Sequence, residues 1–183
     1  MAAETEDKRV RRTKSAIREA LLQLISDKPI ARVTTTELCR EANINRNTFY
    51  AHYSTPEDVL AELEDELLAE LSSILDDDRG DGNVTLAMCR AIAASNERWR
   101  ALWRGNASLI ERALTLCRER TLVRWDMQKT RDLEMDEVFL SFITVGASGV
   151  VKKWLEDDCG MPPDQLGSLI NKFVFEGMHA ISE

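Results

Sequence analysis

A short segment near residue 50 concentrates side chains that suit contact with nucleic acid. Guanidinium, amide, hydroxyl, phenol and imidazole groups lie within seven residues, on Arg46, Asn47, Thr48, Tyr50 and His52. Groups of these kinds hydrogen-bond to base edges and to phosphates. If Phe49 faces inward together with Ile44, the five polar side chains are left on or near the outer surface of one short helix.

The residues before this segment predict how that helix is positioned. Hydroxyl groups at Thr34–Thr36 can cap free backbone N–H groups, which predicts a helix beginning near Thr35. Asn43 ends this helix, because asparagine tolerates the left-handed backbone that a turn between helices requires. Asn45 then caps a second helix over about Arg46–His52. Two short helices joined by a tight turn have the outline of a helix-turn-helix that reads DNA.

The charges of the chain are unevenly distributed. The net charge is −8, but residues 1–55 contain 10 Lys+Arg and 7 Asp+Glu, a balance of +3, whereas residues 56–183 contain 14 and 25, a balance of −11. The positive end is therefore the end that carries the helix-turn-helix pattern. Arg11, Arg12 and Lys14 are the best candidates for a basic arm that lies along phosphates or enters a minor groove. For Lys8 and Arg9, a solvated terminus is an equal alternative.

Over Lys14–Leu60 the chain resembles the TetR/AcrR family of bacterial transcription regulators. The pattern is carried by Val33-Thr34, by Ala42-Asn43-Ile44-Asn45 with Arg46–Tyr50 after it, and by His52-Tyr53. The resemblance implies an all-α fold with a three-helix DNA-binding head on a helical body of effector-binding and dimerising helices, about nine helices in total. We expect the DNA-contacting residues to be Arg11, Arg12, Lys14, Thr36, Arg46, Asn47, Thr48, Tyr50 and His52.

Two departures from the family pattern affect this expectation. Asn43 and Asn47 stand where the family usually has Gly, and Pro56 stands where it usually has a Lys that grips a phosphate. Asn43 is a mild change because it can adopt the same turn. Pro56 suits the first turn of a helix, but it removes a cation from the expected DNA face, which would lower DNA affinity.

Apolar periodicity predicts helices through the rest of the chain. The expected ranges are Thr13–Ser26, Pro56–Leu75, Val84–Ser95, Glu97–Trp103, Ala107–Thr130, Glu134–Asp157 and Pro162–Ile181. The acidic, glycine-bearing segment Asp76–Asn83 is expected to be a loop. We assign residues 1–55 to a DNA-binding domain with its basic arm, and residues 56–183 to an effector-binding and dimerisation domain.

Large aromatic and methionine side chains gather in the middle of the chain, where the resemblance implies a cavity for a small effector. The candidate lining residues are Met88, Trp99, Trp103, Trp125 and Met127. Ordinary core packing is the alternative for each of them. No polar constellation in this region identifies the effector.

The last two expected helices are too apolar to be lone surface helices. Gly146 and Gly149 make sense where another helix approaches closely, since glycine otherwise costs roughly 1 kcal/mol relative to alanine in a helix. Paired across a two-fold axis, these helices would form a four-helix homodimer interface. We expect that interface to include Phe142, Gly146, Gly149, Val150, Trp154, Leu169 and Phe173; burial within one subunit is the alternative.

Other classes of protein find little support in the sequence. Met1–Val10 lacks the apolar core of a signal peptide, and the uncharged run Val138–Val151 has 14 residues, short of the roughly 18 that span a membrane. This run is expected to be a buried helix, with no membrane partner and a cytoplasmic location. The four cysteines form no CxxC pair, which favours reduced thiols over a disulfide framework or a metal site.

Enzymatic signatures are also missing. The chain contains only two histidines, no glycine-rich phosphate loop and no HExxH motif, so we expect no catalytic residues and no cofactor. The predicted function is a sequence-specific transcriptional regulator that binds a double-stranded DNA operator as a homodimer, with a repressor controlled by a small-molecule effector as the specific expectation. The alternative is a TetR-like co-activator or protein-interaction module that has lost operator binding.

Overall fold

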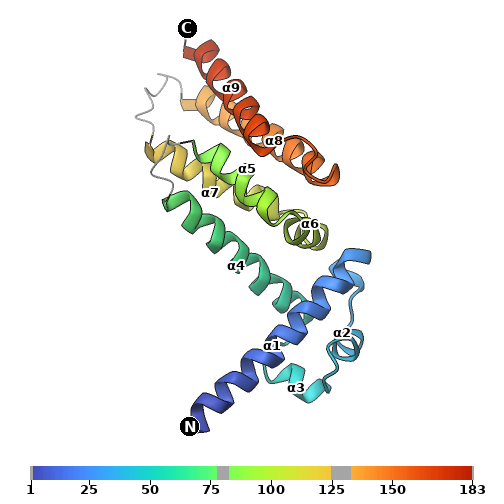
Figure 1. The fold of residues 1–183 in the computed structure, drawn as a ribbon. Helices are drawn as coiled ribbons and strands as arrows, with labels where there is room; N and C mark the ends of the chain where they lie inside the picture. The colour runs from blue at the N-terminus through green and yellow to red at the C-terminus, as the bar shows by residue number, and fades with distance from the viewer. Residues whose placement is uncertain (1, 78–82, 125–132, 183) are drawn as a thin grey trace. The chain divides into compact units, whose positions relative to one another are not determined.

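The computed structural model describes residues 2–77, 83–124 and 133–182, and within these ranges the chain is helical without any strand (Figure 1). The prediction of an all-α fold is confirmed. The elements are α1 (Ala2–Asp27), the 3-10 helix η1 (Ile30–Arg32), α2 (Thr35–Glu41), α3 (Arg46–Tyr50), α4 (Pro56–Asp77), α5 (Val84–Ala94), α6 (Asn96–Gly105), α7 (Leu109–Arg124), α8 (Leu133–Glu156) and α9 (Pro163–Ser182).

The chain forms two compact units. The first, called here the head unit, comprises Met1–Leu67 with Ala101–Ala107, and the second, called the body unit, comprises Leu68–Arg100 with Ser108–Glu183. The division therefore falls inside α4 and inside α6. A functional boundary at residue 55 stays a prediction, since compactness and function need not divide a chain at the same residue.

Within the head unit, local side-chain chemistry sets the helix-turn-helix as the sequence predicts. The Thr34 hydroxyl accepts a hydrogen bond from the Glu37 backbone N–H at 3.2 Å, and α2 begins at Thr35. Asn43 adopts a left-handed backbone with φ 52° and makes the turn. The Asn45 side chain accepts from the Thr48 N–H at 2.8 Å and caps α3.

α1 is longer than expected, because it begins at Ala2 rather than near Thr13. The residues before Thr13 include neither Gly nor Pro and are mostly good helix formers, so the helix continues through the basic segment. Of the two modes expected for the basic segment, lying along phosphates or entering a minor groove, the helical conformation favours the first. A helix with side chains is about 10–12 Å across, whereas the minor groove is about 6 Å wide.

The start of α4 is fixed by a reciprocal cap and by Pro56. A carboxylate oxygen of Asp58 accepts from the backbone N–H groups of Ser54 and Thr55, at 2.9 and 2.8 Å, and the Asp58 N–H donates to the Thr55 hydroxyl at 3.2 Å. Pro56 is the first residue of the helix and is buried. A lysine at this position would reach solvent only by extending its aliphatic stem.

Within the body unit, α5 packs against α9 and α7, α7 packs against α8, and α8 lies beside α9 (Figure 1). Gly167 lies where α9 closely approaches α5: a Cβ atom there would come within 2.9 Å of the Leu86 Cα. Apolar side chains from every helix of this unit form its core. The largest fully buried ones are Leu71, Leu75, Met88, Ile92 and Trp99.

α8 differs from the expectation of a buried helix. Its segment Glu137–Glu156 is 20 residues long, with a mean hydropathy of 1.4, and is only 22% buried. By length and composition alone this segment passes the criterion for a membrane span, unlike the 14-residue run on which the sequence argument was based. Most of its apolar surface therefore has no cover from the rest of the described subunit.

Candidate nucleic-acid interface

α3 presents its polar side chains outward because one aromatic residue anchors it. Phe49 is fully buried, and its ring lies 6.0 Å from that of Tyr53, measured between centroids. Arg46, Asn47 and Tyr50 are exposed, whereas Thr48 and His52 are half-buried. Thr36, on α2, is also exposed. A five-residue helix is too short to hold its own conformation, so the Asn45 cap and this anchor determine its direction.

Arg46 and Tyr50 form a pair on the outer surface of α3. The Arg46 guanidinium donates a hydrogen bond to the Tyr50 hydroxyl at 3.2 Å and lies 5.8 Å from the centroid of its ring. This hydrogen bond lowers the pKa of the Tyr50 phenol below its usual value. The two residues are four positions apart, and one turn of helix places them in contact.

The Thr48 hydroxyl is engaged in the cap of its own helix. It donates to the Asn45 side-chain oxygen at 3.0 Å, while the Thr48 N–H donates to the same atom. Its methyl group and its remaining lone pairs are the parts that stay available for a partner.

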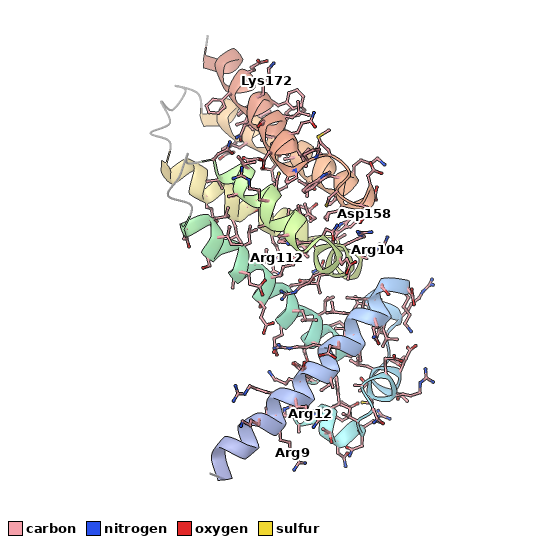
Figure 2. All side chains as sticks on the ribbon, in the orientation of Figure 1. Arg9, Arg12, Arg104, Arg112, Asp158 and Lys172 are labelled. Atoms are coloured by element: carbon pink, nitrogen blue, oxygen red, sulfur yellow. The ribbon has the colours of Figure 1, made fainter. Side chains whose placement is uncertain are left out.

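A groove of about 460 Å³ runs between the N-terminal half of α1 and α3. Figure 2 shows the side chains of Arg9 and Arg12 projecting from this half of α1. Arg9, for which a solvated terminus was an equal alternative, lines the groove. The expected contacts Asn47 and Thr48 line it from α3, and His52 lines it from the turn after α3. The full lining is Arg9, Val10, Thr13, Asn45, Asn47, Thr48, Ala51 and His52.

Lys14 is held differently from its exposed neighbours Arg11 and Arg12. Its ammonium bonds both carboxylate oxygens of Glu62, at 3.1 and 3.0 Å, and lies 5.1 Å from the centroid of the Tyr53 ring. The hydrogen bond to Glu62 raises the pKa of Lys14. Sequence reasoning missed Glu62 because it lies far along the chain from Lys14, on α4, and only the packing of α1 on α4 brings them together.

Two of the five residues expected to line an effector cavity lie in the core. Met88 and Trp99 are buried in the body unit, whereas Trp103 is half-buried and belongs to the head unit. Trp125 and Met127 lie outside the described residues. For Met88 and Trp99 the structure favours the core alternative, since both side chains are 1% exposed.

The body unit has an open groove of about 510 Å³ between α4 and α7. Its wall includes Glu111, one oxygen of which accepts hydrogen bonds from the Ser148 hydroxyl at 3.0 Å and from Lys152. Burial opposes ionisation of this carboxyl, but the bonds from Lys152 and Ser148 outweigh it and hold the pKa of Glu111 below its usual value. The lining residues are Leu68, Ala69, Ser72, Ser108, Glu111, Arg112, Thr115 and Leu116.

α8 and α9 carry an exposed apolar face, which includes most of the residues expected at a dimer interface. Phe142 is 73% exposed and Phe173 59%, and nothing in the described subunit lies within 4 Å of a Cβ built at Gly146 or Gly149. A groove of about 370 Å³ lies along this face. The exposed large apolar side chains of α8 and α9 are Val138, Phe142, Val145, Val150, Leu169, Phe173 and Phe175.

The expectation that Trp154 belongs to this interface is wrong. It is 5% exposed, and its indole N–H donates to the Met161 backbone oxygen at 2.8 Å, so it belongs to the core of the subunit. The reason is the position of Trp154 around the axis of α8. Trp154 lies on the side of α8 that also buries Val151 and Leu155, whereas Phe142, Gly146 and Gly149 lie on the exposed side.

The described residues contain no group of three or more His, Cys, Asp or Glu side chains placed to hold a metal ion. None of the four cysteines in these residues forms a disulfide, and three of them are buried.

Comparison with known proteins places the helix-turn-helix in a family. Residues 17–63 match the family described as bacterial regulatory proteins, tetR family. The chain is 36% identical over 66 residues to YxbF of Bacillus subtilis (strain 168), described as an uncharacterized HTH-type transcriptional regulator. That similarity covers 36% of this chain and 17% of the length of YxbF, so the chain spans less than a fifth of this curated relative.

Solved structures share the fold over nearly the whole chain. A TetR transcriptional regulator from Streptococcus agalactiae 2603V has a TM-score of 0.63 at 20% identity, covering 94% of this chain and 98% of that one. The fatty acid degradation regulator FadR from Bacillus halodurans has a TM-score of 0.60 at 14% identity, covering 88% and 94%. The dihydroxyacetone kinase operon activator DhaS has a TM-score of 0.57 at 16% identity, covering 92% and 97%.

The solved structures resemble this chain in fold, and its helix-turn-helix resembles the family in sequence. The residues that carry both are the capped, anchored helices α2 and α3 and their support α1. Over residues 17–63 the chain matches the TetR family of bacterial regulatory proteins, and its fold resembles that of a solved TetR transcriptional regulator.

Proposed function

We propose that this protein is a sequence-specific DNA-binding regulator of transcription, in which α3 enters the major groove of an operator. The observation that carries the proposal is the surface of α3, where Arg46, Asn47 and Tyr50 are exposed on a helix that Asn45 caps and Phe49 anchors. Readout of base edges requires a helix that is held in a fixed direction and presents guanidinium and amide groups outward.

We propose that the active form is a homodimer formed through α8 and α9. The support is the apolar face of these helices, with Phe142, Val145 and Phe173 all more than half exposed. Exposed glycines at Gly146 and Gly149 leave room for a second pair of helices to approach closely. Such an interface also accounts for an apolar α8 without a membrane, and two heads would engage two half-sites.

We propose that the regulator is a repressor controlled by a small molecule that binds the body unit. The groove between α4 and α7 is the best-supported location, because Leu68, Ala69 and Ser72 on its wall belong to α4. The same helix carries Pro56–Leu67 in the head unit. A ligand that binds one conformation of α4 more tightly would shift the population of heads competent for DNA.

The proposal is tested by selecting preferred duplexes from a random library and measuring their affinity against salt concentration. A regulator should select a two-fold symmetric sequence and show a steep salt slope. Arg46→Ala or Asn47→Ala should relax sequence preference, whereas Tyr50→Phe should weaken good and poor sites about equally if its hydroxyl contacts a phosphate. The absence of any salt-dependent duplex binding would instead favour a protein-interaction module.

A further inference from the structure

The ammonium of Lys14 lies in a cluster of four charged side chains that joins α1 to α4. Glu62 accepts hydrogen bonds from Lys14 through both oxygens and is also bonded by Arg18. Arg18 donates in turn to Glu66 at 2.7 Å. The charges of the two cations and the two carboxylates therefore balance. Glu62 is the carboxylate that contacts both cations.

The position of Lys14 places this cluster beside the candidate DNA surface. Thr13, the preceding residue, lines the groove between α1 and α3. The Lys14 ammonium lies over the ring of Tyr53, which packs against Phe49, the anchor of α3. Lys14 therefore lies next to the support of α3, and its ammonium is paired with Glu62.

A carboxylate and a phosphate compete for the same ammonium, because each offers anionic oxygens at hydrogen-bond distance. The pair is half-buried, with 32% of the Lys14 side chain and 29% of the Glu62 side chain exposed, so water screens it only in part. Loss of the charge on Glu62 would still leave Arg18 paired with Glu66, whereas Lys14 would lose its carboxylate partner.

We propose that Glu62 competes with DNA phosphate for Lys14. This competition makes the DNA affinity of the head lower than it would be if Lys14 contacted a phosphate. The inference rests on the proposed DNA-binding function. In this arrangement Lys14 contributes to folding of the head rather than to the DNA contact, and α1 contributes its DNA-facing cations from the turns before it, where Arg9 lines the groove.

The test compares salt slopes of duplex binding for the wild type, Glu62→Gln and Glu66→Gln. Each phosphate contact adds about 0.9 to the slope of log K against log salt concentration. Glu62→Gln should bind more tightly than the wild type. Because a bound dimer carries two heads, its slope should be steeper by about 1.8, so that its advantage falls about twelvefold between 50 and 200 mM salt. Glu66→Gln removes one negative charge from the same helix and should keep the wild-type slope.

Lys14→Met separates this mechanism from a general effect of charge, because methionine keeps an apolar stem beside Tyr53. In the wild type this change should leave the salt slope unaltered, and in Glu62→Gln it should abolish the gain. Circular dichroism and thermal unfolding check that each variant is folded.

Each remaining outcome is decisive. A wild type that binds no duplex refutes the proposed function itself. A binding wild type with an unchanged slope in Glu62→Gln refutes the competition. A slope lowered by about 1.8 in the single variant Lys14→Met also refutes it, because it would show that Lys14 of each head already contacts phosphate. An equal gain in Glu66→Gln would show that only overall charge matters.

Discussion

At the scale of single residues, the position of α3 depends on the backbone conformation of Asn43. Its φ of 52° turns the chain between α2 and α3, and the Ile44 N–H then donates to the Cys39 carbonyl at 3.0 Å. Asparagine reaches this left-handed region at less cost than residues with larger or branched side chains, and glycine reaches it most easily.

Substitution at Asn43 should therefore follow backbone freedom. Asn43→Ala should lower the free energy of unfolding by about 1 kcal/mol, whereas Asn43→Gly should be close to neutral. Urea unfolding followed by circular dichroism measures both. Equal losses in the two variants would show that the amide side chain, rather than the backbone, stabilises the turn.

Burial of a thiol gives a second residue-scale prediction. Burial, with smaller effects from Cys159 and Asp164, raises the pKa of Cys89 from its usual 9.0 to about 12. The unfolded thiol ionises near its usual pKa while the folded one stays neutral. The contribution of Cys89 to stability is thus complete below about pH 9 and is lost as the pH rises toward 12, at most about 4 kcal/mol.

The measurement is the free energy of unfolding of the wild type and of Cys89→Ala between pH 8 and 10.5. Alanine leaves a small cavity and costs stability at pH 8, but the difference between the proteins should shrink as the pH rises. Parallel curves for the two proteins over this range would contradict a raised pKa of the thiol.

At the scale of helices, the glycines of α8 and α9 have opposite environments. Gly167 lies against the backbone of α5, with Leu86 Cα 2.9 Å from a built Cβ, whereas nothing lies within 4 Å of a Cβ at Gly149. Gly167 is therefore required by the packing of one subunit. Gly149 has no such requirement there.

Gly167→Ala should destabilise the fold by up to about 2 kcal/mol, because overpacking costs about 1–3 kcal/mol and the gain in helix propensity offsets only roughly 1 kcal/mol of it. Thermal and urea unfolding give the comparison. Gly149→Ala is the matched control and should leave the fold of the subunit unharmed or slightly more stable. Stabilisation by Gly167→Ala would show that α5 and α9 can move apart without cost.

At the scale of the whole molecule, the open apolar face of α8 and α9 predicts a dimer whose loss also removes DNA binding. Gly149→Leu and Phe142→Asp should each shift the protein toward a monomer of 20.8 kDa in sedimentation. Operator affinity should fall with it, and the salt slope should drop to about half, since one head then makes the phosphate contacts alone.

Phe142→Leu keeps an apolar side chain and is the control for Phe142→Asp. It should remain dimeric and bind DNA nearly as the wild type does. A wild type that sediments as a monomer at micromolar concentration would refute the two-headed mechanism. A monomeric variant with undiminished operator affinity would show that a single head suffices.

The sequence by itself determined the local structure of the head. Thr34, Asn43 and Asn45 act on backbone groups within three residues of themselves, so their types and spacing were enough to predict the caps and the turn. The apolar pattern likewise predicted helices through the body, though it missed the early start of α1, where charged helix formers give no apolar signal.

Only the tertiary structure decided which side chains of these helices are buried or paired with a neighbouring helix and which are exposed. The pairing of Lys14 with Glu62, the burial of Trp154 and the contrast between Gly167 and Gly149 each depend on the helix that packs alongside. Periodicity identifies an apolar helix, but it does not say which neighbour covers each side of it, because that is fixed by contacts between residues far apart in the chain.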